Sequence, residues 1–113
     1  MREELELFLI YVVNSLSKLH ILLFFYHNRG LLDTVEGLVM KTGLDKREAK
    51  ETLEALLFSE IVSKHNGSGE TLWFYNPSQR KEALVEEVVS LYSTPQGKEK
   101  ILNTLVRYLI TQR

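Results

Sequence analysis

Residues 42–64 have the sequence TGLDKREAKETLEALLFSEIVSK, and this stretch decides the fold. Gly43 is a typical stop signal for the helix before it. Asp45, with Glu48 three residues later, has the form of a capping box that starts the next helix. After Glu60, β-branched residues replace the helical pattern and indicate a strand. The apolar residues of the second helix recur at helical spacing and are Ala49, Leu53, Leu56 and Leu57.

A β-hairpin is predicted at residues 61–75. The segment Asn66-Gly67-Ser68-Gly69 is a turn between two short runs rich in β-branched and aromatic residues, which is the pattern of a hairpin. Because side chains alternate along a strand, Trp73 and Tyr75 are expected to pack under the preceding helix. Stacking on nucleic-acid bases is the alternative role for these aromatic residues.

Helices are also predicted before this unit. An apolar stripe at helical spacing covers residues 1–16, and a second helix runs from about 17 to 27, where an Asn-Arg-Gly segment ends it. Asp33, followed three residues later by Glu36, is the predicted N-cap of the helix that Gly43 ends.

Two helices are predicted after the hairpin. Asn76 is the expected N-cap of the first, because Asn caps well and the following Pro77 suits the first helical turn. Thr94 and Pro95 start the last helix. The predicted elements form a mostly α fold with a two-stranded β-wing, and 113 residues suffice for a single domain.

The order of elements and three short motifs resemble winged helix-turn-helix bacterial repressors of the MarR and ArsR types. Residues 42–46 are similar to the T-G-L-S-x turn that precedes the recognition helix of those proteins. Leu53 and Leu56 are similar to the leucine pair that packs that helix, and residues 60–64 to the G-L-I/V-x-R/K segment that enters the wing. The match spans residues 17–75 without a gap.

The resemblance implies a winged-helix head at about residues 17–76 and a role as a homodimeric transcriptional regulator. The terminal helices, at 1–16 and 77–113, are the expected dimerisation elements, since exposed apolar stripes of that length would promote aggregation of a monomer. The recognition helix would enter the major groove of double-stranded DNA, and the wing would contact the flanking backbone. The sequence departs from the family at Glu51, Glu54, Glu60 and the Gly67-Ser68-Gly69-Glu70 wing tip.

The predicted DNA-binding residues lie on the recognition helix, on the wing and at the start of the preceding helix. Arg47 is the candidate base contact, because its planar fork matches a guanine edge. Thr34 is a candidate donor to a phosphate. The full predicted set is Thr34, Lys46, Arg47, Lys50, Glu51, Lys64, His65 and Asn66.

The charge distribution keeps a second interpretation open. The formal net charge is −1, and residues 45–60 contain three basic and five acidic side chains. Phosphate neutralisation supplies most non-specific affinity for DNA, so an acidic segment disfavours such binding. The alternative is a protein-interaction adaptor without DNA binding that uses the same helix face and the apolar terminal helices.

Other classes of function have little support. The chain has no cysteine, which excludes a disulfide scaffold, a thiolate zinc site and a cysteine nucleophile. His20 and His27 lie about two helical turns apart, too far to share one metal ion. The sequence has no Ser-His-Asp context and no Gly-rich phosphate loop that would indicate an enzyme. Neither catalysis nor a cofactor is therefore predicted. No signal peptide is recognisable, and we expect a cytoplasmic protein; the strongest apolar run, residues 21–26, is too short to span a bilayer.

Overall fold

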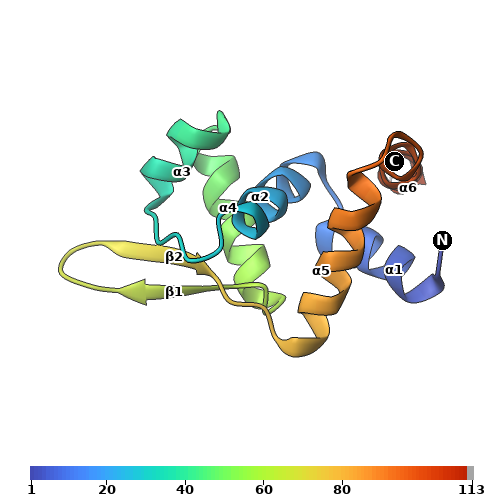
Figure 1. The fold of residues 1–113 in the computed structure, drawn as a ribbon. Helices are drawn as coiled ribbons and strands as arrows, with labels where there is room; N and C mark the ends of the chain where they lie inside the picture. The colour runs from blue at the N-terminus through green and yellow to red at the C-terminus, as the bar shows by residue number, and fades with distance from the viewer. Residues whose placement is uncertain (112–113) are drawn as a thin grey trace.

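The computed structural model describes residues 1–111. The molecule measures 44 × 31 × 24 Å, with a β-hairpin at one end and the first and last helices at the other (Figure 1). It is mostly helical, with one two-stranded antiparallel sheet. In chain order the elements are α1 (Glu3–Phe8), the π-helix η1 (Leu9–Val13), α2 (Leu16–His27), α3 (Val35–Thr42), α4 (Lys46–Phe58), β1 (Val62–Asn66), β2 (Thr71–Tyr75), α5 (Gln79–Tyr92) and α6 (Pro95–Thr111).

Helices α3 and α4 form the predicted helix-turn-helix. Gly43 ends α3 with a φ of 77°, a left-handed conformation that glycine adopts without steric cost. Asp45 caps α4, and its carboxylate accepts a hydrogen bond of 2.8 Å from the Glu48 N–H. The predicted apolar side of α4 faces inward, since Leu53 and Leu56 are completely buried.

The N-cap of α3 is Thr34, so the prediction of Asp33 was wrong by one residue. Thr34 Oγ1 accepts a hydrogen bond of 3.1 Å from the Gly37 N–H. Asp33 instead pairs with the hairpin: its backbone exchanges two hydrogen bonds, of 2.8 and 3.1 Å, with Trp73. This extended pairing holds Asp33 outside the helix and ties the start of α3 to the hairpin.

Strands β1 and β2 form the predicted hairpin. Val62 lies opposite Tyr75, and Asn66 lies opposite Thr71 next to the turn. Trp73 is buried and Tyr75 is partly buried against the core, as predicted, but β2 packs mainly against α2 and α3, whereas β1 is the strand that packs against the preceding helix α4. The element order and this hairpin define a helix-turn-helix followed by a β-wing, with helical extensions at both ends.

Glu60 lies at the entry to the hairpin with a φ of 61°. This left-handed conformation costs a residue other than glycine about 1–2 kcal/mol. Backbone hydrogen bonds on both sides hold it: the Glu60 N–H donates to Leu57 O at 3.1 Å, and the Ser78 N–H donates to Glu60 O at 3.0 Å. The winged-helix repressors that the sequence resembles have glycine here, and the backbone conformation supplies a physical reason for that preference.

Helix α2 lies at the centre of the molecule. Leu19, Ile21, Leu22 and Phe25 on this helix are completely buried. It packs against α4 and also contacts α3, α5, β2 and η1. A helix that is apolar on most sides is stable only when other elements surround it. The burial of α2 therefore fixes the helix-turn-helix relative to the terminal helices.

The sequence predicts one helix over residues 1–16; the helix is present, but it ends at Val13 and its second half is a π-helix. Helix α1 continues into η1, and Asn14 follows with a φ of 42°. The chain then turns, so that Leu16 belongs to α2 and is half exposed. Within residues 1–111 no single helix has both the length and the apolar character to cross a membrane; α1–η1 and α2 meet that test only as a pair bent by 105°.

Helix α5 begins at Gln79, and its N-cap is Ser78 rather than the predicted Asn76. Asn76 remains part of the chain that leaves the hairpin. Its N–H donates to Ile61 O at 3.0 Å, and its side-chain amide donates to Ser63 Oγ at 3.0 Å. These bonds hold Asn76 beside the end of the hairpin, and Ser78 caps the helix instead, its hydroxyl accepting a hydrogen bond of 3.4 Å from the Lys81 N–H.

Helix α6 begins at Pro95, as predicted. Thr94 Oγ1 accepts a hydrogen bond of 3.0 Å from the Gly97 N–H. The elbow between α5 and α6 is tight, and a Cβ atom on Gly97 would lie 2.0 Å from the carbonyl oxygen of Leu91. Glycine at this position therefore allows α6 to approach the end of α5 closely.

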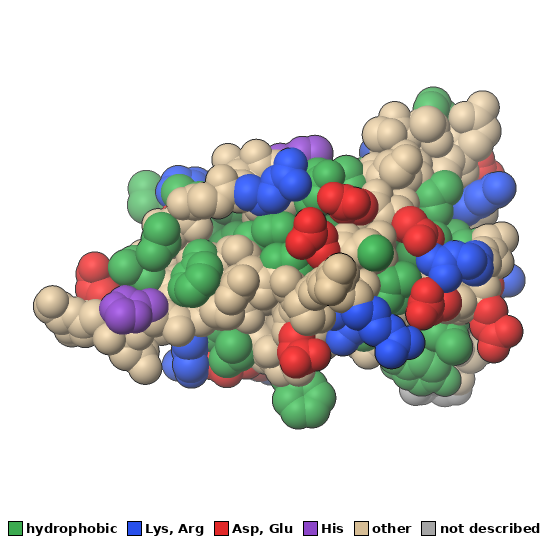
Figure 2. Space-filling model, turned by 60° about the horizontal axis from the view of Figure 1, so that its bottom comes forward, with side chains coloured by type: hydrophobic (Ala, Val, Ile, Leu, Met, Phe, Trp, Pro, Cys, Tyr) green, Lys and Arg blue, Asp and Glu red, His purple; other side chains and the backbone are tan. Residues whose placement is uncertain are grey.

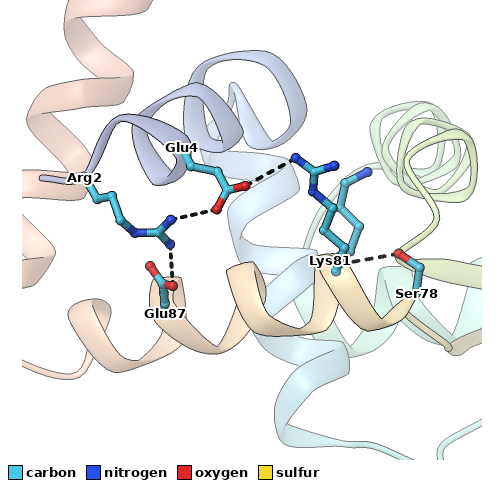
Figure 3. A network of polar contacts seen from close by, with 6 residues as sticks. Arg2, Glu4, Ser78, Lys81 and Glu87 are labelled. Carbon is cyan, nitrogen blue, oxygen red and sulfur yellow. Dashed lines mark hydrogen bonds and ion pairs between the residues drawn. The ribbon is translucent and has the colours of Figure 1, made fainter.

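Ion pairs connect the start of the chain to α5 (Figure 3). Arg2 pairs with Glu4 at 2.6 Å and also with Glu87, and Arg80 pairs with Glu4 at 3.3 Å. Hydrogen bonds from Arg2, and then from Arg80, hold the pKa of the Glu4 carboxyl below its ordinary value. Since these side chains are exposed, the pairs orient α1 on α5 more than they stabilise the fold.

Candidate nucleic-acid interface

One side of α4 lies open to solvent, and we call it the outward face of α4. Its central residue, Arg47, has an 88% exposed side chain. The opposite side of the helix, which includes Ala49 and Leu53, is buried. A shallow, open hollow follows the outward face, lined by Lys46, Arg47, Lys50, Glu51 and Glu54.

A second depression, the wing groove, lies between the start of α3, α4 and the hairpin. It brings together Thr34, Lys46, Lys50 and Lys64, which the sequence predicted as site residues on three separate elements. Trp73 also lines the groove, and the Lys64 Nζ lies 5.5 Å from the centroid of its ring. The complete lining is Thr34, Val35, Glu36, Lys46, Lys50, Glu54, Lys64, Gly69, Glu70, Thr71 and Trp73.

His65 and Asn66 lie outside both depressions. Both belong to β1 and are exposed near the hairpin turn. The Asn66 side-chain oxygen accepts a hydrogen bond of 2.8 Å from the Thr71 hydroxyl, which links the two strands next to the turn. The structure therefore places these two predicted residues at the wing tip, apart from the lysines of the groove.

Three of the four predicted basic residues are paired with glutamates of the same chain. Their shortest nitrogen–oxygen distances are 3.1 Å for Lys46–Glu36, 3.1 Å for Arg47–Glu51 and 3.8 Å for Lys64–Glu54. Within residues 1–111, Lys50 forms no ion pair. Exposed pairs of this kind are worth only about 0–1 kcal/mol each, so a competing anion can displace the carboxylates at low cost.

The charges of the wing groove balance. Three lysines line it, and so do three glutamates: Glu36, Glu54 and Glu70. The pKa of the Glu36 carboxyl lies below its ordinary value, first because its own backbone N–H donates to it and second because Lys46 does. On the side of the molecule that Figure 2 shows, basic and acidic side chains are likewise interspersed, without an extended field of one sign.

Sequence reasoning did not include Glu36 and Glu54 among the site residues. The signal for Glu54 was present, because it lies seven residues after Arg47 and four after Lys50 on one helix. Glu36 gave no comparable signal, since its pairing with Lys46 depends on how α3 and α4 cross.

A second exposed surface lies at the other end of the molecule, and we call it the terminal face. It comprises the exposed apolar side chains of α1, η1 and α6, of which Val106 and Ile110 lie on the side of α6 away from η1. Tyr11 is 71% exposed and Ile110 is 63% exposed. A groove between η1 and the end of α6 is lined by Tyr11 and by the oppositely charged residues Glu6 and Arg107. The exposed apolar residues of the terminal face are Leu7, Tyr11, Val106, Leu109 and Ile110.

The fold and these two surfaces define a helix-turn-helix with a β-hairpin wing and an apolar helical end. One solved structure with a similar fold is a possible transcriptional regulator from Methanosarcina mazei Go1. It has a TM-score of 0.57 and 15% sequence identity, and the similarity covers 86% of this chain and 83% of that one. No known family model and no curated protein matches the chain. At this identity the likeness shows the fold alone, so membership of the MarR or ArsR families stays a prediction.

Proposed function

We propose that this protein is a transcriptional regulator that binds double-stranded DNA as a homodimer. The observation that carries the proposal is the wing groove, where lysines from α4 and the hairpin lie beside the start of α3. An exposed helix next to a β-wing is the arrangement with which winged helices bind the major groove. The name of the Methanosarcina mazei structure supports a regulatory role.

The proposed contacts follow from where each side chain lies. Arg47, at the centre of the outward face, would contact a guanine edge. Lys46, Lys50 and Lys64 would contact phosphates, each paired lysine exchanging its carboxylate for a phosphate oxygen. The Thr34 hydroxyl would donate to a phosphate at the start of α3. His65, Asn66 and Glu51 complete the predicted set. His65 and Asn66, at the wing tip, would contact the DNA backbone that flanks the major groove.

The terminal face is the proposed dimer interface. An apolar surface on adjoining helices is stabilised when a second copy covers it. The two charged residues that line its groove, Glu6 and Arg107, can pair across a twofold axis, because each copy supplies both signs. The terminal face and the wing lie at opposite ends of the molecule (Figure 1), so such a dimer would leave both wings free.

Fluorescence anisotropy with a random-sequence duplex, at low and at moderate salt, tests the proposal. Binding should weaken steeply with salt, because several phosphate contacts release counterions. The double variant Arg47→Ala/Lys50→Ala should abolish it. The matched control Lys98→Ala/Lys100→Ala removes the same charge from α6 and should retain binding. Undiminished binding of the α4 variant would refute the role of this helix.

A protein-interaction adaptor without DNA binding is the second candidate. The observation in its favour is that glutamates already neutralise three of the four basic side chains. Two large apolar side chains of the helix-turn-helix, Met40 on α3 and Phe58 at the end of α4, are also 87% and 92% exposed. The same anisotropy experiment separates the two functions, because the adaptor predicts no salt-dependent binding of any duplex.

A further inference from the structure

The outward face of α4 includes two carboxylates, those of Glu51 and Glu54. Arg47, Glu51 and Glu54 follow one another at intervals of four and three residues, so they share one side of the helix. This side is opposite the buried residues Ala49 and Leu56. A helix that entered the major groove with this side would bring Glu51 and Glu54 close to a polyanion. Phosphates would repel both carboxylates, unless the bases offered them a hydrogen-bond donor.

Glu51 and Arg47 are arranged as a unit. The Arg47 Nε donates to Glu51 Oε1 at 3.1 Å across one helical turn. This bond uses one edge of the guanidinium and leaves its two terminal amino groups for another acceptor. It also leaves the second carboxylate oxygen of Glu51 without a hydrogen bond from any residue in 1–111. The two side chains are 88% and 67% exposed, so both can reach a ligand.

The chemistry of this unit matches one combination of base edges. The O6 and N7 atoms of guanine are the acceptors that suit an arginine fork, and the N4 amino group of cytosine is the donor that suits a glutamate. Both edges lie in the major groove, either within one G·C pair or on adjacent pairs. A sequence that offers both would satisfy Arg47 and Glu51 together, whereas other sequences would leave the carboxylate repelled.

We infer that Glu51 is a specificity-determining residue that selects a cytosine amino group next to the guanine bound by Arg47. This inference rests on the proposed function, since it concerns the same face of α4. Glu54 differs from Glu51 because it pairs with Lys64 of the hairpin and lines the wing groove. The Arg47–Glu51 unit therefore carries the inference.

Selection from a pool of random duplexes, followed by sequencing, tests it. The wild-type chain should enrich duplexes with a G·C-containing step in each half-site. The variant Glu51→Ala should retain DNA binding, but its enrichment of cytosine next to the guanine should fall about tenfold or more. The variant Glu51→Gln should shift the preference toward adenine, which a glutamine amide binds through N6 and N7.

The control variant Glu36→Ala removes the same charge from another exposed glutamate that pairs with a residue of α4. It should strengthen binding to all duplexes equally and leave the preferred bases unchanged. If Glu51→Ala behaved like Glu36→Ala, Glu51 would act only through its charge, and the inference would be overturned while DNA binding stood. If the wild-type chain retained no duplex at low salt, the proposed function would fail and the inference with it; if it retained duplexes without enriching any sequence, the inference alone would be overturned.

Discussion

The outward face of α4 and the terminal face differ in what their exposure to water costs. The α4 face consists of charged side chains that water solvates well and that pair with each other at little net gain. The terminal face exposes apolar side chains, such as Tyr11 and Ile110, whose removal from water is favourable by roughly 25 cal/mol per Å². The first surface is suited to exchanging one ionic partner for another, and the second to permanent assembly. The contrast shows why a net charge near zero on the outward face of α4 does not by itself argue against DNA binding.

The largest effect is expected from a charge placed on the terminal face. The variant Ile110→Glu should dissociate the dimer, since burying an unpaired carboxylate in an apolar interface costs several kcal/mol. Sedimentation equilibrium at micromolar concentration measures this change directly. We expect a dimeric wild-type protein and a monomeric variant.

The control for this experiment is Met40→Glu on α3. Met40 is 87% exposed, more than Ile110, so exposure alone would predict the same result for both variants. Because Met40 lies outside the terminal face, its substitution should leave the dimer intact. A wild-type monomer, or equal effects of the two variants, would contradict the assignment of the interface.

A smaller effect is expected at the elbow that positions the terminal face. In the variant Gly97→Ala, the new Cβ would meet the Leu91 carbonyl oxygen at 2.0 Å, so backbone must shift. Overpacking of this kind costs about 1–3 kcal/mol, which a urea unfolding curve measures. The matched substitution Gly67→Ala in the wing turn meets no atom closer than 3.7 Å and should change stability little. Equal stability of the two variants would show that the elbow tolerates a side chain.

The part of the fold that the sequence predicted best is the part with strong local signals. Gly43 and Asp45 act through bonds within a few residues, so their positions fixed the turn between α3 and α4 without reference to the rest of the chain. The hairpin was equally clear, because a Gly-containing turn separated two β-rich runs. The apolar side of α4 followed from spacing alone.

The two N-cap predictions that failed depended on contacts between distant segments. Asp33 and Asn76 are good capping residues, but each is taken up by backbone hydrogen bonds to the hairpin region, with Trp73 and Ile61 respectively. The break at Asn14 is different, because it carries a local signal that the sequence prediction missed: Asn14 takes the left-handed conformation at the end of η1, and the Ser15 hydroxyl caps α2 by accepting a hydrogen bond of 3.1 Å from the Lys18 N–H. Capping propensity describes what a residue can do, and tertiary pairing decides which role it takes.

The candidate site was predicted in part for the same reason. The exposed positions of α4 followed from the helical period, whereas the pairing of Lys46 with Glu36 depends on the packing of α3 beside α4. The balance of charge in the wing groove is therefore a property of the folded molecule. A count along residues 45–60 gives an excess of acid, but it does not show which carboxylates face which cations.

The smallest expected effect concerns the Lys46–Glu36 pair. The pKa of Glu36 lies below its ordinary value of 4.5, first through its own backbone N–H and second through Lys46. A carboxyl with a lowered folded pKa stabilises the fold above its unfolded pKa and loses that contribution as the pH falls through the folded value. The contribution is thus present at neutral pH and lost below about pH 4.5.

An NMR titration of the Glu36 side chain measures this shift. The variant Lys46→Ala should raise the pKa of Glu36 only part of the way, because the backbone hydrogen bond remains. Lys100→Ala, which removes the same charge from α6, should leave it unchanged. Saturating duplex DNA should raise the pKa of Glu36 in the wild-type chain, since Lys46 would then face a phosphate. A pKa that neither the variant nor the duplex altered would show that Glu36 does not compete with DNA for Lys46.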